Sequence, residues 1–295
     1  MSFFRAIVIG LIQGVTELFP VSSLGHSVLV PYVLGWKTLV SGQRASESPY
    51  LAFIVGLHCA SALALLAFYW RDWVGLIKAF FRTLRTRKIE TSEERLIWLL
   101  VIATIPAGLI GLVAEHKLRV LFSKPLAAAL FLILNGLILF AGERIRQRSE
   151  VRALAARQGT EPDGGRRLDT LDFKEAGIIG FFQSAALLAG ISRSGVTMVG
   201  GLVRGLDHED AVKFAFLLAT PIILAAGVYK IPDLTGPLGN GIRGQVLAGS
   251  VVAGVASYLS VRFLTNYFRT RTLTPFAIYS VVAGILFTAF YFAIG

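Results

Sequence analysis

The chain of 295 residues has 55% hydrophobic and 16% charged side chains, and its mean hydropathy is +0.67. Because soluble domains carry about 25% charged residues, this composition excludes an ordinary soluble protein and indicates an integral membrane protein. The net charge of +11 does not indicate nucleic-acid binding, since the basic residues flank apolar segments, as in membrane proteins. The single cysteine, Cys59, excludes a disulfide framework. The amino terminus lacks the features of a cleaved signal peptide, so we expect it to be mature sequence.

The first stretch, residues 3–35, is apolar but broken by prolines and glycines, and it carries Glu17 and His26 on either side of Pro20. A straight span would bury both ionisable groups and leave backbone groups near Pro20 without hydrogen bonds. A re-entrant helix–turn–helix that faces protein or water tolerates them. We therefore expect a broken helical unit here.

Six uninterrupted apolar segments are long enough to cross a bilayer as helices, which takes about 17–25 residues. They lie near residues 50–70, 96–114, 126–142, 211–230, 245–264 and 276–293. The polar stretches 71–95 and 143–174 are expected to be loops, and the second of them links two halves of the chain.

A second apolar stretch interrupted by turn residues lies at residues 175–205, and three spans follow each of the two interrupted units. When the sequence is aligned with itself at an offset of 170 positions, five residues are identical. Gly10, Gln13, Leu18, Ser22 and Gly25 align with Gly180, Gln183, Leu188, Ser192 and Gly195. We predict an all-α polytopic membrane protein with a single integral membrane domain, residues 1–295. Its inverted repeats cover about residues 1–142 and 175–295, each a re-entrant helix–turn–helix plus three transmembrane helices, and the basic linker 143–174 joins them.

The charges of the loops predict the orientation. If each broken unit enters and leaves on one side, the second half starts on the opposite face from the first, which makes the halves inverted repeats. Three loops on one face carry 17 Lys and Arg residues and the opposite loops carry 6, so the first face is expected to be cytoplasmic and both termini extracytoplasmic. Inverted-repeat folds place their site near the midplane, where the two turns are expected to meet.

The second turn, residues 189–197, has the composition of an anion site. Gly190 allows close approach of the backbone, and a helix amino terminus supplies free N–H groups. Arg193 can donate two parallel hydrogen bonds to phosphate oxygens. Hydroxyl groups surround it: Ser192, Ser194 and Thr197. This turn is therefore expected to bind phosphate.

The first turn, residues 13–26, adds candidate catalytic groups. His26 follows Ser23 by three residues, so a hydroxyl–imidazole pair can form on one helical face, as in an activated nucleophile. His26 could instead attack phosphorus or protonate a leaving group. Glu17 could orient His26 or hold a divalent cation. Ser22 is a candidate phosphate ligand.

Structural interpretations stand beside these. Glu17 and Arg193 could form only an ion pair between the repeats, and His26 could be a packed, hydrogen-bonded histidine. Ser22 and Ser192 could be no more than helix caps. His58 lies alone in a span and is expected to be packed.

Both turns resemble motifs of the undecaprenyl-pyrophosphate phosphatases, the bacitracin-resistance proteins of bacterial membranes. The first motif runs from Gln13 to His26 and the second from Ala189 to Thr197. The resemblance implies cleavage of undecaprenyl pyrophosphate to the monophosphate carrier of peptidoglycan synthesis, and resistance to bacitracin, which sequesters that substrate. It also implies a multi-pass protein of the bacterial cytoplasmic (inner) membrane, lying in the lipid bilayer, with a site open to the extracytoplasmic side and no nucleic acid among its partners.

Carried over by position, the resemblance assigns catalysis to Glu17, Ser23, His26 and Arg193, and phosphate binding to Ser22, Ser192, Ser194, Thr197 and Gly190. It further implies dependence on Mg²⁺ or Ca²⁺, with Glu17 and Gln13 as the ligands. Two positions depart from the family pattern: Gln13 stands where many members have glutamate, and Ala189 replaces a proline. The loss of a negative charge at Gln13 weakens the case for a metal site.

The expected mechanism is attack of Ser23, deprotonated by His26, on the terminal phosphorus, with His26 itself as the alternative nucleophile. The polyprenyl tail is expected to lie in a groove open to lipid. A secondary transporter or flippase is the competing hypothesis, because broken helices at the midplane are also typical of transporters. A transporter needs an anion site but no nucleophile. The oligomeric state stays open, a homodimer included.

Overall fold

A computed structural model describes residues 1–36, 39, 48–122, 124–156 and 166–294. Every regular element in this part of the chain is a helix, which confirms the predicted all-α class. Six helical segments are long and apolar enough to span a membrane, with mean hydropathies between 1.5 and 2.5, and all six match predicted spans. They are Pro49–Phe68, Ser92–Ala114, Pro125–Ser149, His208–Tyr229, Arg243–Tyr267 and Thr274–Ala293.

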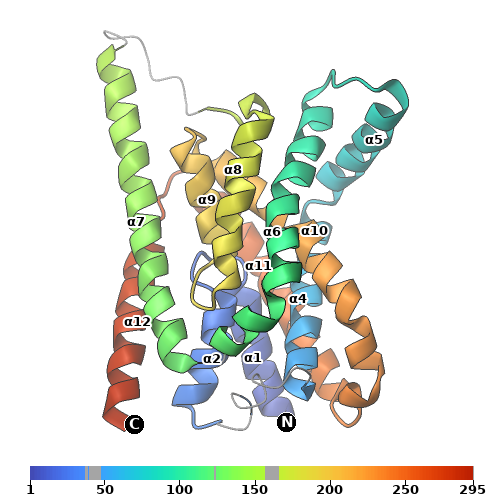
Figure 1. Cartoon of the computed structure of the whole chain (residues 1–295), viewed down its shortest axis with the longest axis vertical. Helices are drawn as coiled ribbons and strands as arrows, with labels where there is room; N and C mark the ends of the chain where they lie inside the picture. Colours follow the sequence, from blue (N-terminus) through green and yellow to red (C-terminus); the bar gives the residue numbers. More distant parts are fainter. Residues whose placement is uncertain (37–38, 40–47, 123, 157–165, 295) are drawn as a thin grey trace.

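Each half begins with a pair of shorter helices. In the first half these are α1 (Phe3–Thr16) and α2 (Ser23–Val33); in the second they are α8 (Phe173–Gln183), the short η2 (Ser184–Leu187) and α9 (Arg193–Val203). Ser2 caps α1 and Asp172 forms a capping box with Glu175 at the start of α8. Figure 1 shows α1 starting at one end of the molecule and α8 at the other, so the two pairs approach the centre from opposite ends.

The long helices surround these pairs. In chain order they are α4 (Pro49–Phe68), α5 (Trp70–Thr86), α6 (Ser92–Phe122), α7 (Pro125–Ala156), α10 (His208–Thr235), α11 (Arg243–Tyr267) and α12 (Thr274–Ile294). The remaining elements are two short 3₁₀ turns, η1 (Leu168–Thr170) and η3 (Pro237–Gly239). Both termini lie at the same end (Figure 1).

Glycines at equivalent repeat positions let the first arm of each pair pack closely on a long helix. A Cβ at Gly10 would collide with the backbone of Gly249 on α11, and a Cβ at Gly180 would collide with the backbone of Ala103 on α6. Small residues allow such backbone contacts between membrane helices. Each first arm therefore packs on a span of the other half of the chain. The inverted relation of the halves across a bilayer stays a prediction.

Two of the predicted loops are largely helical. Within 71–95 the chain forms α5, whose buried side chains Leu76, Ala79 and Thr83 are spaced along one face, while its basic side chains are exposed. This amphipathic pattern allows a helix that packs one side on α6, where Trp98 Nε1 donates to Thr83 Oγ1 at 3.0 Å. In the linker, α7 continues to Ala156, and residues 157–165 lie outside the described part of the chain.

Candidate active site

Two turns from opposite halves of the chain meet near the centre of the molecule (Figure 1). One joins α1 to α2 and the other joins α8 to α9. Gly25 and Gly190 lie where they touch: a Cβ on Gly25 would be 3.0 Å from the Cα of Gly190. Gly190 has φ of +109°, and a Cβ there would lie 2.6 Å from the Cβ of Phe131 on α7. Glycine is therefore required at this contact.

The Ser22 hydroxyl joins the two turns. Its Oγ accepts hydrogen bonds from the backbone N–H of Gly25 at 3.2 Å and of Gly190 at 3.1 Å. Ser22 also has φ of +67°, a conformation that costs a residue with a side chain about 1–3 kcal/mol. The two bonds offset this strain. The predicted helix cap is thus present, and its oxygen also accepts a hydrogen bond from the second half of the chain.

Asn135 of α7 holds both turns from one side. Its Nδ2 donates to the carbonyl of Pro20 at 2.9 Å, and its Oδ1 accepts from the N–H of Ser192 at 2.9 Å. The side chain is fully buried, and Nδ2 also lies 3.2 Å from the Ser280 hydroxyl of α12. The sequence did not identify Asn135 as a site residue, because an asparagine in a membrane span can equally make contacts between helices.

The serines around Arg193 contact the first turn. Ser192 Oγ caps α9 by accepting from Gly195 N–H at 3.1 Å. Ser192 and Ser194 hydroxyls lie 3.0 Å apart and donate to the carbonyl of Phe19 at 3.4 and 3.3 Å. Both serines, predicted as phosphate ligands, therefore lie against the backbone of the first turn.

Glu17 is the centre of the site, and its side chain is only 3% exposed. Arg193 Nη2 donates to Oε1, and Ser23 Oγ donates to Oε2. Oε2 also accepts from Gln13 Nε2 at 2.9 Å and lies 3.3 Å from His58 Nε2. A buried carboxylate needs such partners, because an unpaired buried charge is strongly destabilising. Of the predicted site residues, the structure thus brings together Gln13, Glu17, Ser23 and Arg193, and His58 joins them.

His26 has other partners than Ser23. Its Nδ1 lies 2.7 Å from the Ser22 carbonyl, and its Nε2 lies 2.8 Å from the hydroxyl of Tyr279 on α12. A carbonyl only accepts, so Nδ1 carries the hydrogen and Nε2 accepts from Tyr279. The expected Ser23–His26 contact is not formed among the described residues. Tyr279 is a site residue that the sequence analysis missed, because it lies 253 residues away from His26.

Several buried polar atoms of α1, α8 and α9 have no hydrogen-bond partner in the described part of the chain. They are Gln13 Oε1, Arg193 Nε, Thr197 Oγ1 and both amide atoms of Gln183. Buried polar atoms are nearly always bonded to protein or water. Arg193 and Thr197 lie one turn apart on α9, so their open donors share a face. These atoms have capacity for a polar ligand such as phosphate.

The predicted divalent cation would need oxygen ligands from the residues around Glu17. No group of three or more His, Cys, Asp or Glu side chains occurs among the described residues. Gln13 Oε1 has no partner, and Glu17 supplies the carboxylate beside it. This donor pair fits a hard cation such as Mg²⁺ that takes its remaining oxygens from substrate and water.

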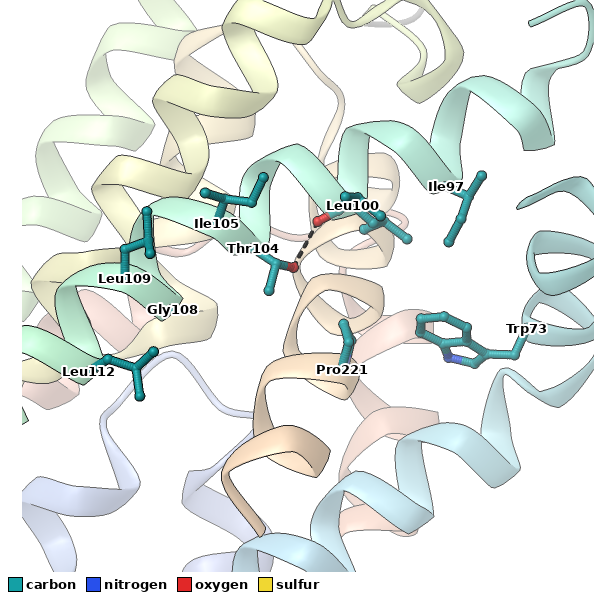
Figure 2. A pocket seen from close by; sticks show the side chains of 10 residues that line it. Trp73, Ile97, Leu100, Thr104, Ile105, Gly108, Leu109, Leu112 and Pro221 are labelled. Atoms are coloured by element: carbon teal, nitrogen blue, oxygen red, sulfur yellow. Dashed lines mark hydrogen bonds between the residues drawn. The ribbon is translucent and has the colours of Figure 1, made fainter. Parts of the chain in front are cut away.

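An apolar cavity of about 450 Å³ lies between α5, α6 and α10 (Figure 2). Its one hydroxyl, on Thr104, donates to the Leu100 carbonyl at 2.7 Å. None of the polar side chains of the two turns lines it. The lining residues are Trp73, Ile97, Leu100, Val101, Thr104, Ile105, Gly108, Leu109, Leu112 and Pro221.

Comparisons with known proteins show the family of the chain. Residues 6–286 match the family described as bacitracin resistance protein BacA. Undecaprenyl-diphosphatase 2 of Frankia alni is 55% identical to the chain, covering 98% of it and 97% of the relative. The undecaprenyl-diphosphatase of Mycolicibacterium paratuberculosis is 58% identical over 96% of the chain and 95% of the relative. That of Granulibacter bethesdensis is 42% identical over 97% and 95%. The chain is therefore a multi-pass membrane protein that belongs to the BacA family of bacitracin resistance proteins.

Proposed function

We infer that this chain hydrolyses undecaprenyl pyrophosphate to undecaprenyl phosphate and inorganic phosphate. The observation that carries the inference is the buried contact of Ser23 and Arg193 with the same carboxylate, Glu17. It joins a nucleophile, a proton acceptor and a phosphate-binding cation in one place. The names of the relatives supply the substrate.

The chemistry follows from the contacts. Ser23 Oγ donates its hydrogen to Glu17 Oε2, so this carboxylate is the group placed to receive the proton when Ser23 attacks the terminal phosphorus. The bond from that phosphorus to the bridging oxygen breaks, and its electron pair leaves with undecaprenyl phosphate. Water then hydrolyses the phosphoserine, which releases phosphate and restores the Ser23 hydroxyl. We assign the first proton acceptance to Glu17 in place of His26, because His26 Nδ1 is bonded to Ser22.

Arg193 and the hydroxyls bind the phosphates in this proposal. The open donors of Arg193 and Thr197 would bond to phosphate oxygens, and charge-assisted bonds from arginine are among the strongest available. Ser192 and Ser194 lie beside them, and Gly190 keeps the backbone close. His26, with Nε2 bonded to Tyr279, is placed to exchange a proton with water or the leaving group.

Gln13 and Glu17 would hold the divalent cation, Mg²⁺ or Ca²⁺. When bound, the ion would supply neutralisation of the negative charge on the pyrophosphate. The chain's own residues still bind the phosphates and accept the proton.

The cellular setting is part of the proposal. We place the protein in the bacterial inner membrane with the basic loops cytoplasmic and the site open to the extracytoplasmic side. There it would recycle the lipid carrier of peptidoglycan synthesis and compete with bacitracin for the substrate. The apolar cavity of Figure 2 has the chemistry to accept part of the prenyl chain. Nothing in the comparisons favours the transporter hypothesis, since the relatives are named diphosphatases.

The test is phosphate release from undecaprenyl pyrophosphate by the detergent-purified protein. Wild type is compared with Arg193→Ala, Ser23→Ala and His26→Ala, each with Mg²⁺, with Ca²⁺ and with chelator. We expect rapid release by wild type and collapse in Arg193→Ala and Ser23→Ala. An active Ser23→Ala beside an inactive His26→Ala would make His26 the nucleophile. No release by folded wild type under any cation would overturn the proposed function.

A further inference from the structure

His58 approaches the catalytic carboxylate from a separate helix. It lies in the middle of α4, where its Nε2 is 3.3 Å from Glu17 Oε2 and its Nδ1 is 2.9 Å from the carbonyl of Ile54. The Glu17 side chain is 3% exposed and that of His58 20% exposed. The contact is therefore formed largely inside the protein, where an ion pair or hydrogen bond is screened little by water.

The two ring nitrogens define what His58 does. The Ile54 carbonyl can only accept, so Nδ1 donates to it, and this bond one turn back along α4 fixes the plane of the ring. Nε2 then points at a carboxylate oxygen, which also accepts. Both nitrogens therefore carry hydrogen, and His58 faces Glu17 as an imidazolium donor, from a rigid helix and in a fixed orientation.

The oxygen that His58 contacts is the one that faces the nucleophile. Ser23 donates to Oε2, while Arg193 donates to Oε1. Gln13 also donates to Oε2, but it lies on α1, which Glu17 caps at its C-terminus, so the two move together. His58 is thus the contact to Oε2 from α4, a long helix outside the two turns, and it holds this oxygen toward Ser23.

We propose that His58 is a positioning residue for phosphoryl transfer, which holds Glu17 Oε2 where it accepts the Ser23 proton. The proposal rests on the phosphatase function inferred above. It concerns the rate of the chemical step rather than substrate binding, because His58 contacts Glu17 and not the open donors of Arg193 and Thr197. Displacement of a catalytic group by about 1 Å can lower the rate on the order of 100-fold.

Two amide substitutions of His58 distinguish a positioning role from a role in packing alone. The amide nitrogen of glutamine can reach the place of Nε2, whereas the shorter asparagine reaches only the place of Nδ1. We would measure kcat and KM for undecaprenyl pyrophosphate in His58→Gln and His58→Asn, normalised to folded protein by size-exclusion fluorescence. The matched control is His208→Asn, which removes another buried imidazole–carboxylate contact, 2.9 Å to Glu143, away from the site.

The expected result is a fall in kcat of roughly 10–100-fold for His58→Asn, with KM changed by less than about threefold and kcat largely restored in His58→Gln. His208→Asn is expected to lower the melting temperature but to retain kcat. Equal kcat in the two His58 variants, or a loss confined to KM, would overturn the positioning role alone. An inactive wild type would overturn the proposed function, and the positioning role with it.

Discussion

Replacing Asn135 should test how the two turns are held together. This residue of α7 is fully buried and bonds to a carbonyl of the first turn and an N–H of the second. The change Asn135→Leu keeps the branching of the side chain at Cγ and removes both bonds. We expect the protein to lose stability and the two turns to lose their alignment.

The size of the stability loss follows from the two backbone groups that lose their hydrogen bonds. The Pro20 carbonyl and the Ser192 N–H would each be left without a bond from this side chain, and an unsatisfied buried polar group costs about 1–3 kcal/mol. Two such groups predict a loss of roughly 2–6 kcal/mol in the free energy of unfolding. The third contact, 3.2 Å to Ser280, is a bond between two side chains that leave no backbone group behind. Ser280→Ala leaves one buried N–H of Asn135 without this partner and should therefore cost about 1–3 kcal/mol, half of the loss predicted for the two backbone groups.

The assay is equilibrium unfolding in mixed micelles, combined with the phosphate-release rate at a temperature where each variant is folded. Asn135→Leu is expected to show both the larger loss of stability and a lower kcat, while Ser280→Ala loses less stability and retains kcat because both turns stay bonded to Asn135. If Asn135→Leu cost no more than Ser280→Ala, the reasoning that Asn135 connects the turns would be refuted.

Three further changes have separate readouts. Gly190→Ala forces a side chain into a left-handed backbone and against α7, so we expect a loss of roughly 1–3 kcal/mol from the backbone alone, measured by the same unfolding assay. Gly108→Phe, which has open space around its Cβ, should fill the apolar cavity and raise KM for undecaprenyl but not farnesyl pyrophosphate, whereas Val113→Phe on the exposed side of α6 should leave both unchanged. Arg166 donates to Glu175 at 2.6 Å and holds the pKa of that carboxyl below its ordinary value. The pair stabilises the fold above the ordinary pKa, and this stability is lost as pH falls through the lowered pKa. In Glu175→Gln the free energy of unfolding should therefore depend less on pH in the acid range.

The spans were predictable because their signal is local. Apolar length and the basic flanks are properties of contiguous sequence, and all six segments appeared where expected. The helix α5 was missed because seven basic residues in 71–95 suggested a loop, while the buried Leu76, Ala79 and Thr83 are few and spaced on one side. An amphipathic helix needs only such a narrow apolar face.

The site was predictable in part, for the same reason. Glu17, Ser23 and Arg193 occur in short polar motifs inside apolar sequence, and this pattern identifies them as candidate site residues. His58 and Tyr279 were not recognised, because each is a single polar residue in a span and its partner lies on another helix. The signal that could have indicated His58 is its ionisable ring in the membrane, where such groups usually have a function.

The Glu17–Arg193 contact shows why an ion pair between the repeats and a catalytic pair need not be alternatives. Arg193 uses Nη2 to bond to Glu17 Oε1, but its Nε has no partner among the described residues. A guanidinium has five N–H donors, so it can keep the carboxylate paired and still bind a phosphate oxygen. Before substrate binds, the pair stabilises a charge that would otherwise be buried alone. In the proposed mechanism the same arginine would also bind pyrophosphate beside Ser23, so the contact that joins the two halves of the chain would also assemble the reacting groups.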